Sequence, residues 1–164
     1  MPRRTRSFLV IASVAIAFAM TACTPVTRGG PIGQGIPDPM LARVNAERAA
    51  VGAAPLTRCA ALDRAAQAHT ADQAAHDQMS HVGSDGSTFV DRAARAGYRG
   101  WTALGENVAY GYPNVASVMD GWMHSPGHRA NILSGNYTHF GAGYAVSSSG
   151  SAYWTQDFGR SGTC

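Results

Sequence analysis

Hydrophobic positions recur at three- and four-residue spacing in several stretches of this chain, and that periodicity predicts helices. Asp38-Pro39 is typical of a helix start, a capping residue followed by proline, and Gly52 is expected to end that first helix. Three further helices are predicted at 60–79, 88–96 and 114–124. The second is rich in alanine, a strong helix former.

Two later runs predict strands: larger and smaller residues alternate at 140–146, and 152–158 is rich in aromatic residues and threonine. The segment 147–151 between them is typical of a hairpin loop. Because helices lie before and between the strand-like stretches, an α+β layered domain is favoured over a parallel α/β sheet. The length of 164 residues allows one such domain, which we place at 38–164.

A leader is indicated at the N-terminus, residues 1–22, where three arginines precede a 15-residue apolar run ending at Ala22. This run is shorter than the roughly 20 residues of a spanning helix. Met20-Thr21-Ala22-Cys23 resembles the lipobox of a bacterial lipoprotein, so Cys23 is expected to carry lipid and anchor the protein at the outer face of the cell membrane. Cleavage by an ordinary signal peptidase, with secretion, is the alternative. Residues 23–37 are predicted to be a flexible tether.

Charge changes this picture little once the leader is removed. All 13 basic residues are arginine, and three lie in the leader, which leaves ten against ten acidic residues. A formally neutral mature chain has no basic stripe to neutralise phosphates, so nucleic acid is not an expected partner. A monomer is expected.

The cysteine count indicates a disulfide. Three cysteines in an exported protein leave one over. If Cys23 carries lipid, Cys59 and Cys164 remain as a pair, and their bridge would close a loop of about 100 residues. Two free thiols are the alternative.

The stretch Trp122–Leu133 draws attention as a candidate site. A helix is expected to run into it and to break at Pro126-Gly127, which leaves His128 just past the break at the edge of a cleft. The alternative is that this turn only joins a helix to the final sheet. Pro126-Gly127 also separates His124 from His128, so the two are not expected to share a helix face as metal ligands do.

Glu106 is the second candidate. The chain has two glutamates, and Gly105-Glu106-Asn107 is flanked by two short runs, 101–104 and 108–110. Amid these apolar residues a carboxylate must be hydrogen-bonded or paired with histidine or arginine. The alternative is that Glu106 only braces a turn. His69 and His76, seven residues apart on the second predicted helix, form either half of a metal site or, as we favour, packed histidines at a helix interface.

Strong catalytic motifs are absent from the sequence. It contains no G-x-S-x-G, H-E-x-x-H, Cys-x-x-Cys or Walker-type pattern.

The chain resembles the CAP superfamily, which includes cysteine-rich secretory, antigen and pathogenesis-related proteins, in its compact bacterial branch. The resemblance covers about residues 38–159, and the blocks that carry it in order are Ser80-His81, Gly97-Tyr98, Gly105-Glu106-Asn107-Val108-Ala109, Trp122-Met123, Ser125-Pro126-Gly127-His128-Arg129-Ala130-Asn131-Ile132-Leu133, Gly141-Ala142-Gly143 and Tyr153-Trp154-Thr155-Gln156-Asp157-Phe158-Gly159.

This resemblance implies an α-β-α sandwich with an antiparallel sheet between helices and a cleft with two histidines and two acidic residues. His81, Glu106 and His128 match three members of that tetrad, while the fourth, a glutamate, falls near Ser125, where no carboxylate stands. Some members bind a divalent metal, often zinc, in this cleft. His81, His128 and Glu106 are therefore the candidate metal ligands, and they are chemically compatible with an open zinc site.

Three functions follow as hypotheses. The first is a cell-envelope binding module whose cleft takes a small hydrophobic, lipid-like ligand. The second is a metal-assisted or serine-type hydrolase that uses the His81/Glu106/His128 cleft, with Ser80 or Ser125 as nucleophile. The third is an interaction scaffold in which the cleft no longer acts.

Overall fold

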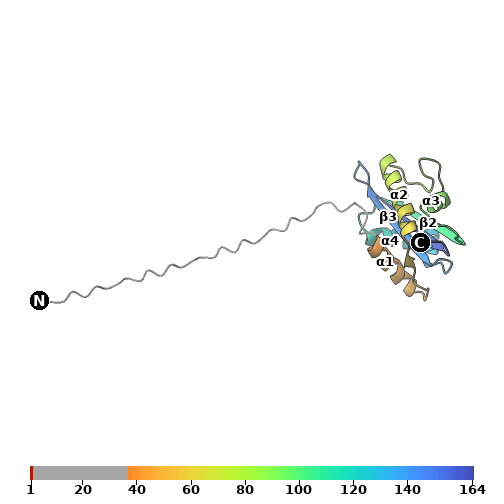
Figure 1. Cartoon of the computed structure of the whole chain (residues 1–164), viewed down its shortest axis with the longest axis horizontal. Helices are drawn as coiled ribbons and strands as arrows, with labels where there is room; N and C mark the ends of the chain where they lie inside the picture. The colour runs from red at the N-terminus through yellow and green to blue at the C-terminus, as the bar shows by residue number, and fades with distance from the viewer. Residues whose placement is uncertain (2–36) are drawn as a thin grey trace.

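The computed structural model describes Met1 and residues 37–164, and within them five helices and four strands follow one another along the chain (Figure 1). The predicted leader 1–22, the lipidation site Cys23 and the tether as far as residue 36 lie outside the described residues. In chain order the elements are α1 (Pro37–Ala49), β1 (Thr57–Arg58), α2 (Ala60–His76), α3 (Phe89–Arg95), β2 (Ala103–Tyr110), α4 (Val115–His124), α5 (Pro126–Leu133), β3 (His139–Val146) and β4 (Ala152–Arg160).

The four strands form one sheet in the order β1-β3-β4-β2. The three long strands pair antiparallel, as expected, and the two-residue β1 adds to β3 in parallel. This arrangement makes β2 an edge strand, paired on one side with β4.

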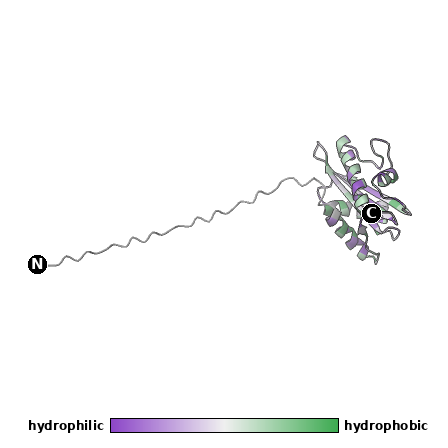
Figure 2. Ribbon diagram, in the orientation of Figure 1, coloured by the Kyte–Doolittle hydropathy of each residue, from purple (hydrophilic) through white to green (hydrophobic). Residues whose placement is uncertain are grey.

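Helices cover both faces of the sheet, so the α+β sandwich is confirmed (Figure 1). On one face α1, α4 and α5 contribute Met40, Val44, Met119, Trp122 and Ile132 to a core with Phe140, Trp154 and Phe158 of the sheet. On the other face α2 packs along β3 and β4, and a smaller cluster joins it to α3. Hydrophobic and hydrophilic positions are mixed along these elements (Figure 2), as elements with one buried face require.

Two glycines of β3 explain why α2 lies so close to the sheet. Gly141 and Gly143 point toward α2, and a Cβ at Gly143 would lie 2.5 Å from the carbonyl oxygen of Ala66. A Cβ at Gly141 would collide with the backbone of Leu62. The helix backbone therefore rests directly on the strand backbone at this point.

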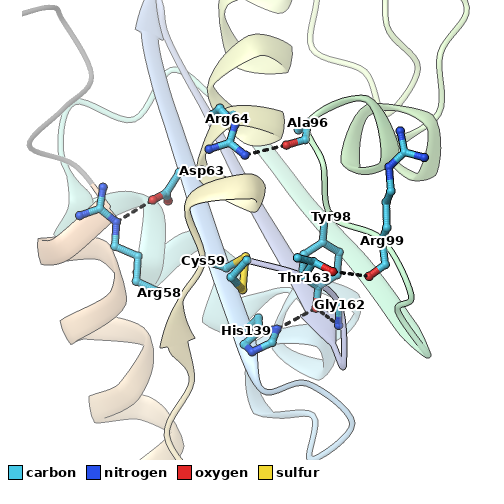
Figure 3. Close-up of a disulfide and its surroundings, with 11 residues drawn as sticks. Arg58, Cys59, Asp63, Arg64, Ala96, Tyr98, Arg99, His139, Gly162 and Thr163 are labelled. Atoms are coloured by element: carbon cyan, nitrogen blue, oxygen red, sulfur yellow. Dashed lines mark hydrogen bonds and ion pairs between the residues drawn. A yellow bond between two sulfur atoms is a disulfide. The ribbon is translucent and has the colours of Figure 1, made fainter.

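The Cys59–Cys164 disulfide is formed, which confirms the predicted pairing (Figure 3). Cys59 is fully buried at the N-cap of α2, and the bridge spans 105 residues. Beside it the hydroxyl of Tyr98 shares a hydrogen bond of 2.9 Å with Nδ1 of His139 and accepts from the amide of Gly162. The C-terminal segment is thereby fixed against the start of α2 and the loop after α3.

Two local predictions were wrong. The predicted end of the helix is present, since α4 stops at His124, but Pro126-Gly127 does not form a turn: Pro126 begins α5, because proline lacks only a donor that the first helical turn leaves unpaired anyway. Gly105-Glu106-Asn107 does not separate two short runs either, since it lies inside the continuous strand β2. No helix among the described residues has the length and apolar character that a bilayer crossing requires.

Candidate functional site

Glu106 enters the site from the middle of β2, facing α2 and α3. Side chains alternate along a strand, so Glu106 and Asn107 point to opposite faces of the sheet. Glu106 lies opposite Asp157 of β4, and Asn107 lies opposite Gln156. One acidic side chain therefore reaches the α2–α3 face while the next amide joins the α4–α5 face.

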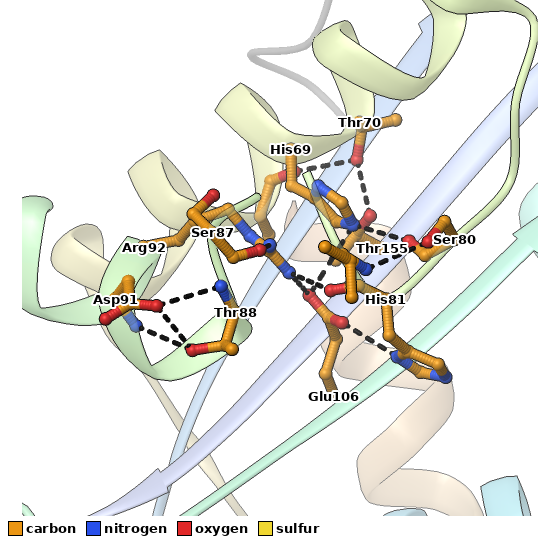
Figure 4. A network of polar contacts seen from close by, with 12 residues as sticks. His69, Thr70, Ser80, His81, Ser87, Thr88, Asp91, Arg92, Glu106 and Thr155 are labelled. Atoms are coloured by element: carbon orange, nitrogen blue, oxygen red, sulfur yellow. Dashed lines mark hydrogen bonds and ion pairs between the residues drawn. The ribbon is translucent and has the colours of Figure 1, made fainter. Parts of the chain in front are cut away.

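The Glu106 carboxylate is buried, with its side chain 1% exposed, and both its oxygens are occupied. His81 donates Nδ1–H to Oε1 at 2.8 Å, and Arg92 donates from Nη2 to Oε2 at 2.6 Å (Figure 4). This arrangement meets the requirement for a buried carboxylate, a hydrogen-bonded counter-ion. Glu106 is thus more than a turn brace.

Arg92 holds the loop that carries His81. Its guanidinium also donates to the carbonyl oxygens of Ser87 at 2.8 Å and of His81 at 3.1 Å. Arg92 projects from α3, whose start is fixed by a capping box between Thr88 and Asp91 (Figure 4). One side chain therefore sets both the backbone of His81 and the carboxylate that orients its ring.

His69 supports the same loop from α2. It is 1% exposed, and its Nε2–H donates to the carbonyl oxygen of Ser80 at 2.7 Å, while Nε2 lies 4.0 Å from Oε2 of Glu106. Burial lowers the pKa of His69, against the opposing pull of the Glu106 charge, so the ring is neutral at neutral pH. The expected packing of the two histidines is thus confirmed for His69 and wrong for His76, which is exposed and bonds its own helix.

His128 lies in the first turn of α5, half-buried, and not in a loop. Its carbonyl oxygen accepts from Nδ2 of Asn107 at 3.2 Å, which ties the start of α5 to β2. Burial, followed by the positive charge of nearby His81, lowers the pKa of His128. The two histidines of the predicted cleft are therefore electrostatic neighbours, whereas His124 is exposed and bonds Asp120.

Asn131 joins α5 to the same strand. Its amide donates to the carbonyl oxygen of Glu106 at 3.2 Å and to Oδ1 of Asn107 at 2.9 Å. Asn107 in turn donates to Gln156 at 3.0 Å. This network of amide side chains fixes the position of His128 relative to Glu106 through their backbone carbonyl oxygens, without using the side chain of either residue.

Asp157 adds a second buried carboxyl behind Glu106. It is 4% exposed, and its Oδ1 has no hydrogen-bond partner within the described part of the chain. Burial and the adjacent Glu106 charge raise the pKa of Asp157 well above its ordinary value. Asp157 comes from β4, not from the position near Ser125.

One ring nitrogen of this site is suited to bind a divalent metal. With Nδ1–H of His81 given to Glu106, its Nε2 is the free ring nitrogen, and a carboxylate that orients a histidine is a common outer partner of metal ligands. Among residues 37–164 no three His, Cys, Asp or Glu side chains are grouped to hold an ion. Glu106, buried and bonded to His81 and Arg92, orients the His81 ring, and the zinc site of His81, His128 and Glu106 stays a prediction.

Within the described part of the chain, the hydroxyl of neither candidate serine bonds a histidine ring. The Oγ of Ser80 accepts from the amide of Val82 at 2.9 Å. Ser125, at the N-cap of α5, makes no side-chain capping bond. The nucleophile–base contact that defines a serine hydrolase is not among the contacts of these two hydroxyls.

The sequence pattern did not single out Arg92, and it assigned no role to Asp157 or Asn131. Arg92 is one of 13 arginines, and no local signal separates it from the solvated ones. The role of Arg92 depends on the packing of its short helix, α3, against β2, and no local sequence pattern reveals that packing.

The family model CAP, described as the cysteine-rich secretory protein family, matches residues 41–158. The uncharacterized protein YkwD of Bacillus subtilis is 38% identical over 114 residues, which is 70% of this chain and 43% of that protein. The chain thus spans less than half the length of this relative.

Solved structures show the same fold. An extracellular protein containing a SCP domain from Bacillus anthracis aligns with a TM-score of 0.71 and 26% identity, covering 79% of this chain and 41% of that one. An outer surface protein of Borrelia burgdorferi aligns with a TM-score of 0.69 and 15% identity, covering 75% of this chain and 90% of that one.

Proposed function

The chain belongs to the CAP family, the cysteine-rich secretory protein family, and from this membership we propose that it is an exported binding module of the cell envelope, anchored to the membrane through lipid at Cys23. The extracellular SCP-domain protein of Bacillus anthracis, similar to this chain, supports export. The apolar leader and the sequence around Cys23 support the anchor.

The observation that carries a binding role is the burial of Glu106 between two donors. A general base must reach the proton that it abstracts, and the Glu106 side chain is 1% exposed, with each oxygen already accepting a short hydrogen bond from His81 or Arg92. The arrangement orients the His81 ring and leaves its Nε2 available to a ligand. Such a histidine suits holding a ligand or an ion.

The proposed ion is a divalent metal such as zinc, held by Nε2 of His81 and by His128. Glu106 fixes the His81 tautomer, and Arg92 keeps Glu106 in place. When bound, the metal would supply a Lewis acid toward a polar ligand group. His81, His128 and Glu106 would then share the site in two roles, two ligands and one orienting group.

The proposed organic ligand is small and hydrophobic. Met79 and Val82 lie within two residues of His81 in the sequence and are 42% and 53% exposed, so the segment that carries His81 also exposes apolar side chains. A fatty-acid-like chain would cover these residues while its polar end meets the cleft.

The test is direct binding of palmitate to the purified protein, followed by tryptophan fluorescence. We expect saturable binding that Val82→Ser weakens and that Val51→Ser, equally exposed at 53% but on another surface, leaves unchanged. Absence of saturable binding, or equal effects of the two variants, would contradict a lipid ligand at this cleft.

A hydrolase is the competing function. It requires that Ser80 or Ser125 approach a histidine, which their present contacts do not provide. Ester hydrolysis that disappears in both Ser125→Ala and His128→Ala would favour a hydrolase over the binding role. A rate that survives in either variant would exclude Ser125 and His128 as nucleophile and base.

A further inference from the structure

A pocket of about 460 Å³ lies between α2, α3 and the loop at 84–87, with His69 and Arg92 as part of its lining. These two residues also approach Glu106, with His69 at 4.0 Å and Arg92 at 2.6 Å. The pocket therefore adjoins the residues that support the His81 cleft, but it includes neither His81 nor His128 in its lining. Its volume is within the range of small-molecule sites.

Both acidic side chains of this pocket already accept hydrogen bonds. Asp72 accepts from the amide and hydroxyl of Ser84 at 2.8 and 2.6 Å. Asp85 accepts from the amide of Ser87 at 2.9 Å and from Arg95 at 2.7 Å. These bonds to Ser87 and Arg95 hold the pKa of Asp85 well below its ordinary value, so the carboxylate stays charged and satisfied.

The donors of the pocket are in surplus. Arg64 donates one hydrogen bond to the carbonyl oxygen of Ala96 at 2.8 Å, and Arg95 donates one to Asp85. Arg92, 7% exposed, keeps Nε without a hydrogen-bond partner within the described residues. A guanidinium carries five N–H donors, so each of the three arginines retains capacity.

The alanines Ala65, Ala68 and Ala96 supply the apolar part of the lining. A ligand that matches this pocket therefore has many hydrogen-bond acceptors and a small apolar body. Carboxylate and phosphate groups are the partners that a guanidinium binds with two parallel bonds.

We infer that the pocket between α2 and α3 binds a small oxyanion-bearing metabolite, with its carboxylate or phosphate held by Arg64 and Arg95 and its body against the alanines. This site is separate from the lipid and metal site proposed above. Because Arg92 borders both, an anion seated here would share its guanidinium with Glu106.

The test is titration of the purified protein with sodium phosphate and, separately, with sodium succinate, at constant ionic strength, followed by amide chemical shifts. We expect saturable shifts at residues of α2 and α3 that line the pocket. Saturation by phosphate alone or by succinate alone would identify the group that is bound, and saturation by both would identify the shared oxyanion chemistry.

Arg64→Gln is the variant that tests the assignment, because Arg64 is exposed and its loss spares the core. Removing one charged donor is expected to weaken binding by about tenfold or more. Arg99→Gln, an exposed arginine outside the pocket, removes the same charge and should leave binding unchanged. Shifts that are linear with both anions, or equal weakening by both variants, would overturn the proposal.

Discussion

His81 and Glu106 are 25 residues apart in sequence and joined by a 2.8 Å hydrogen bond from Nδ1 to Oε1. The His81 side chain is 55% exposed while that of Glu106 is 1% exposed, so the bond connects a surface ring to a buried charge. Arg92 makes this burial tolerable by pairing with the second carboxylate oxygen. Three elements, the loop after α2, α3 and β2, therefore depend on one carboxylate.

Removing that carboxylate should destabilise the fold. Glu106→Ala leaves the guanidinium of Arg92 buried without its counter-ion, and breaking a buried pair in this way costs about 3–5 kcal/mol. Glu47→Ala is the matched control, because its pair with Arg43 lies on the surface and should contribute below about 1 kcal/mol. Urea unfolding measures both, and similar losses would contradict the role given to Glu106.

Zinc binding should depend on two histidines and not on a third. If Nε2 of His81 and His128 hold the ion, zinc should raise the melting temperature of the wild-type protein, and His81→Ala and His128→Ala should each abolish the rise. His124→Ala is the control, since His124 is exposed at the end of α4. No rise in the wild-type protein, measured by thermal shift with zinc and with chelator, would remove the metal proposal.

His69 should make stability fall in mild acid. Burial puts its folded-state pKa below the ordinary 6.5, so the unfolded chain takes up the proton first as pH falls. The stability that the neutral ring contributes to the fold is fully present above about pH 6.5. As the pH falls below that value this stability is lost, by up to about 1.4 kcal/mol per pH unit. His69→Gln keeps a donor for Ser80 but does not titrate.

The measurement is urea unfolding at pH 7 and at pH 5. The difference between these two free energies should be smaller in His69→Gln than in the wild-type protein. His76→Gln, exposed on the same helix, should retain the wild-type difference. An unchanged difference in His69→Gln would show that His69 is not the titrating group.

Local patterns predicted what depends on local physics. Asp38-Pro39 marks the start of α1, and the strand-like runs at 140–146 and 152–158 correspond to β3 and β4. The capping box of Asn114 with Ser117 likewise starts α4 where a helix was expected. Each of these features is decided within a few residues of sequence, and each was recovered.

Non-local pairings were predicted less well. Glu106 was expected to need a histidine or arginine partner, but the choice of Arg92 depends on how α3 packs on β2. The sequence pattern divides β2 into two short runs, because buried Glu106 and Asn107 interrupt its apolar residues and their partners come from other elements. Pro126 was ambiguous because proline both ends and begins helices.

The contact between α2 and β3 gives a last prediction. At Gly143 an added Cβ would lie 2.5 Å from the carbonyl oxygen of Ala66 and 2.6 Å from the hydroxyl of Thr70, closer than packed atoms allow. Relief requires α2 to move away from the sheet, and it would disturb the bond from Thr70 to Thr155. Overpacking of this kind typically costs about 1–3 kcal/mol.

Gly143→Ala should therefore lower the free energy of unfolding, because the obstacle is helix backbone and cannot rotate aside. Gly135→Ala is the control: no atom lies within 4 Å of the position that its methyl group would take, and its backbone angle is accessible to alanine. A Gly143→Ala protein as stable as Gly135→Ala in urea would mean that α2 does not rest on β3 as closely as described. Since α2 also carries His69, the same variant should weaken the support of the Ser80–His81 loop and reduce any zinc-dependent rise in melting temperature.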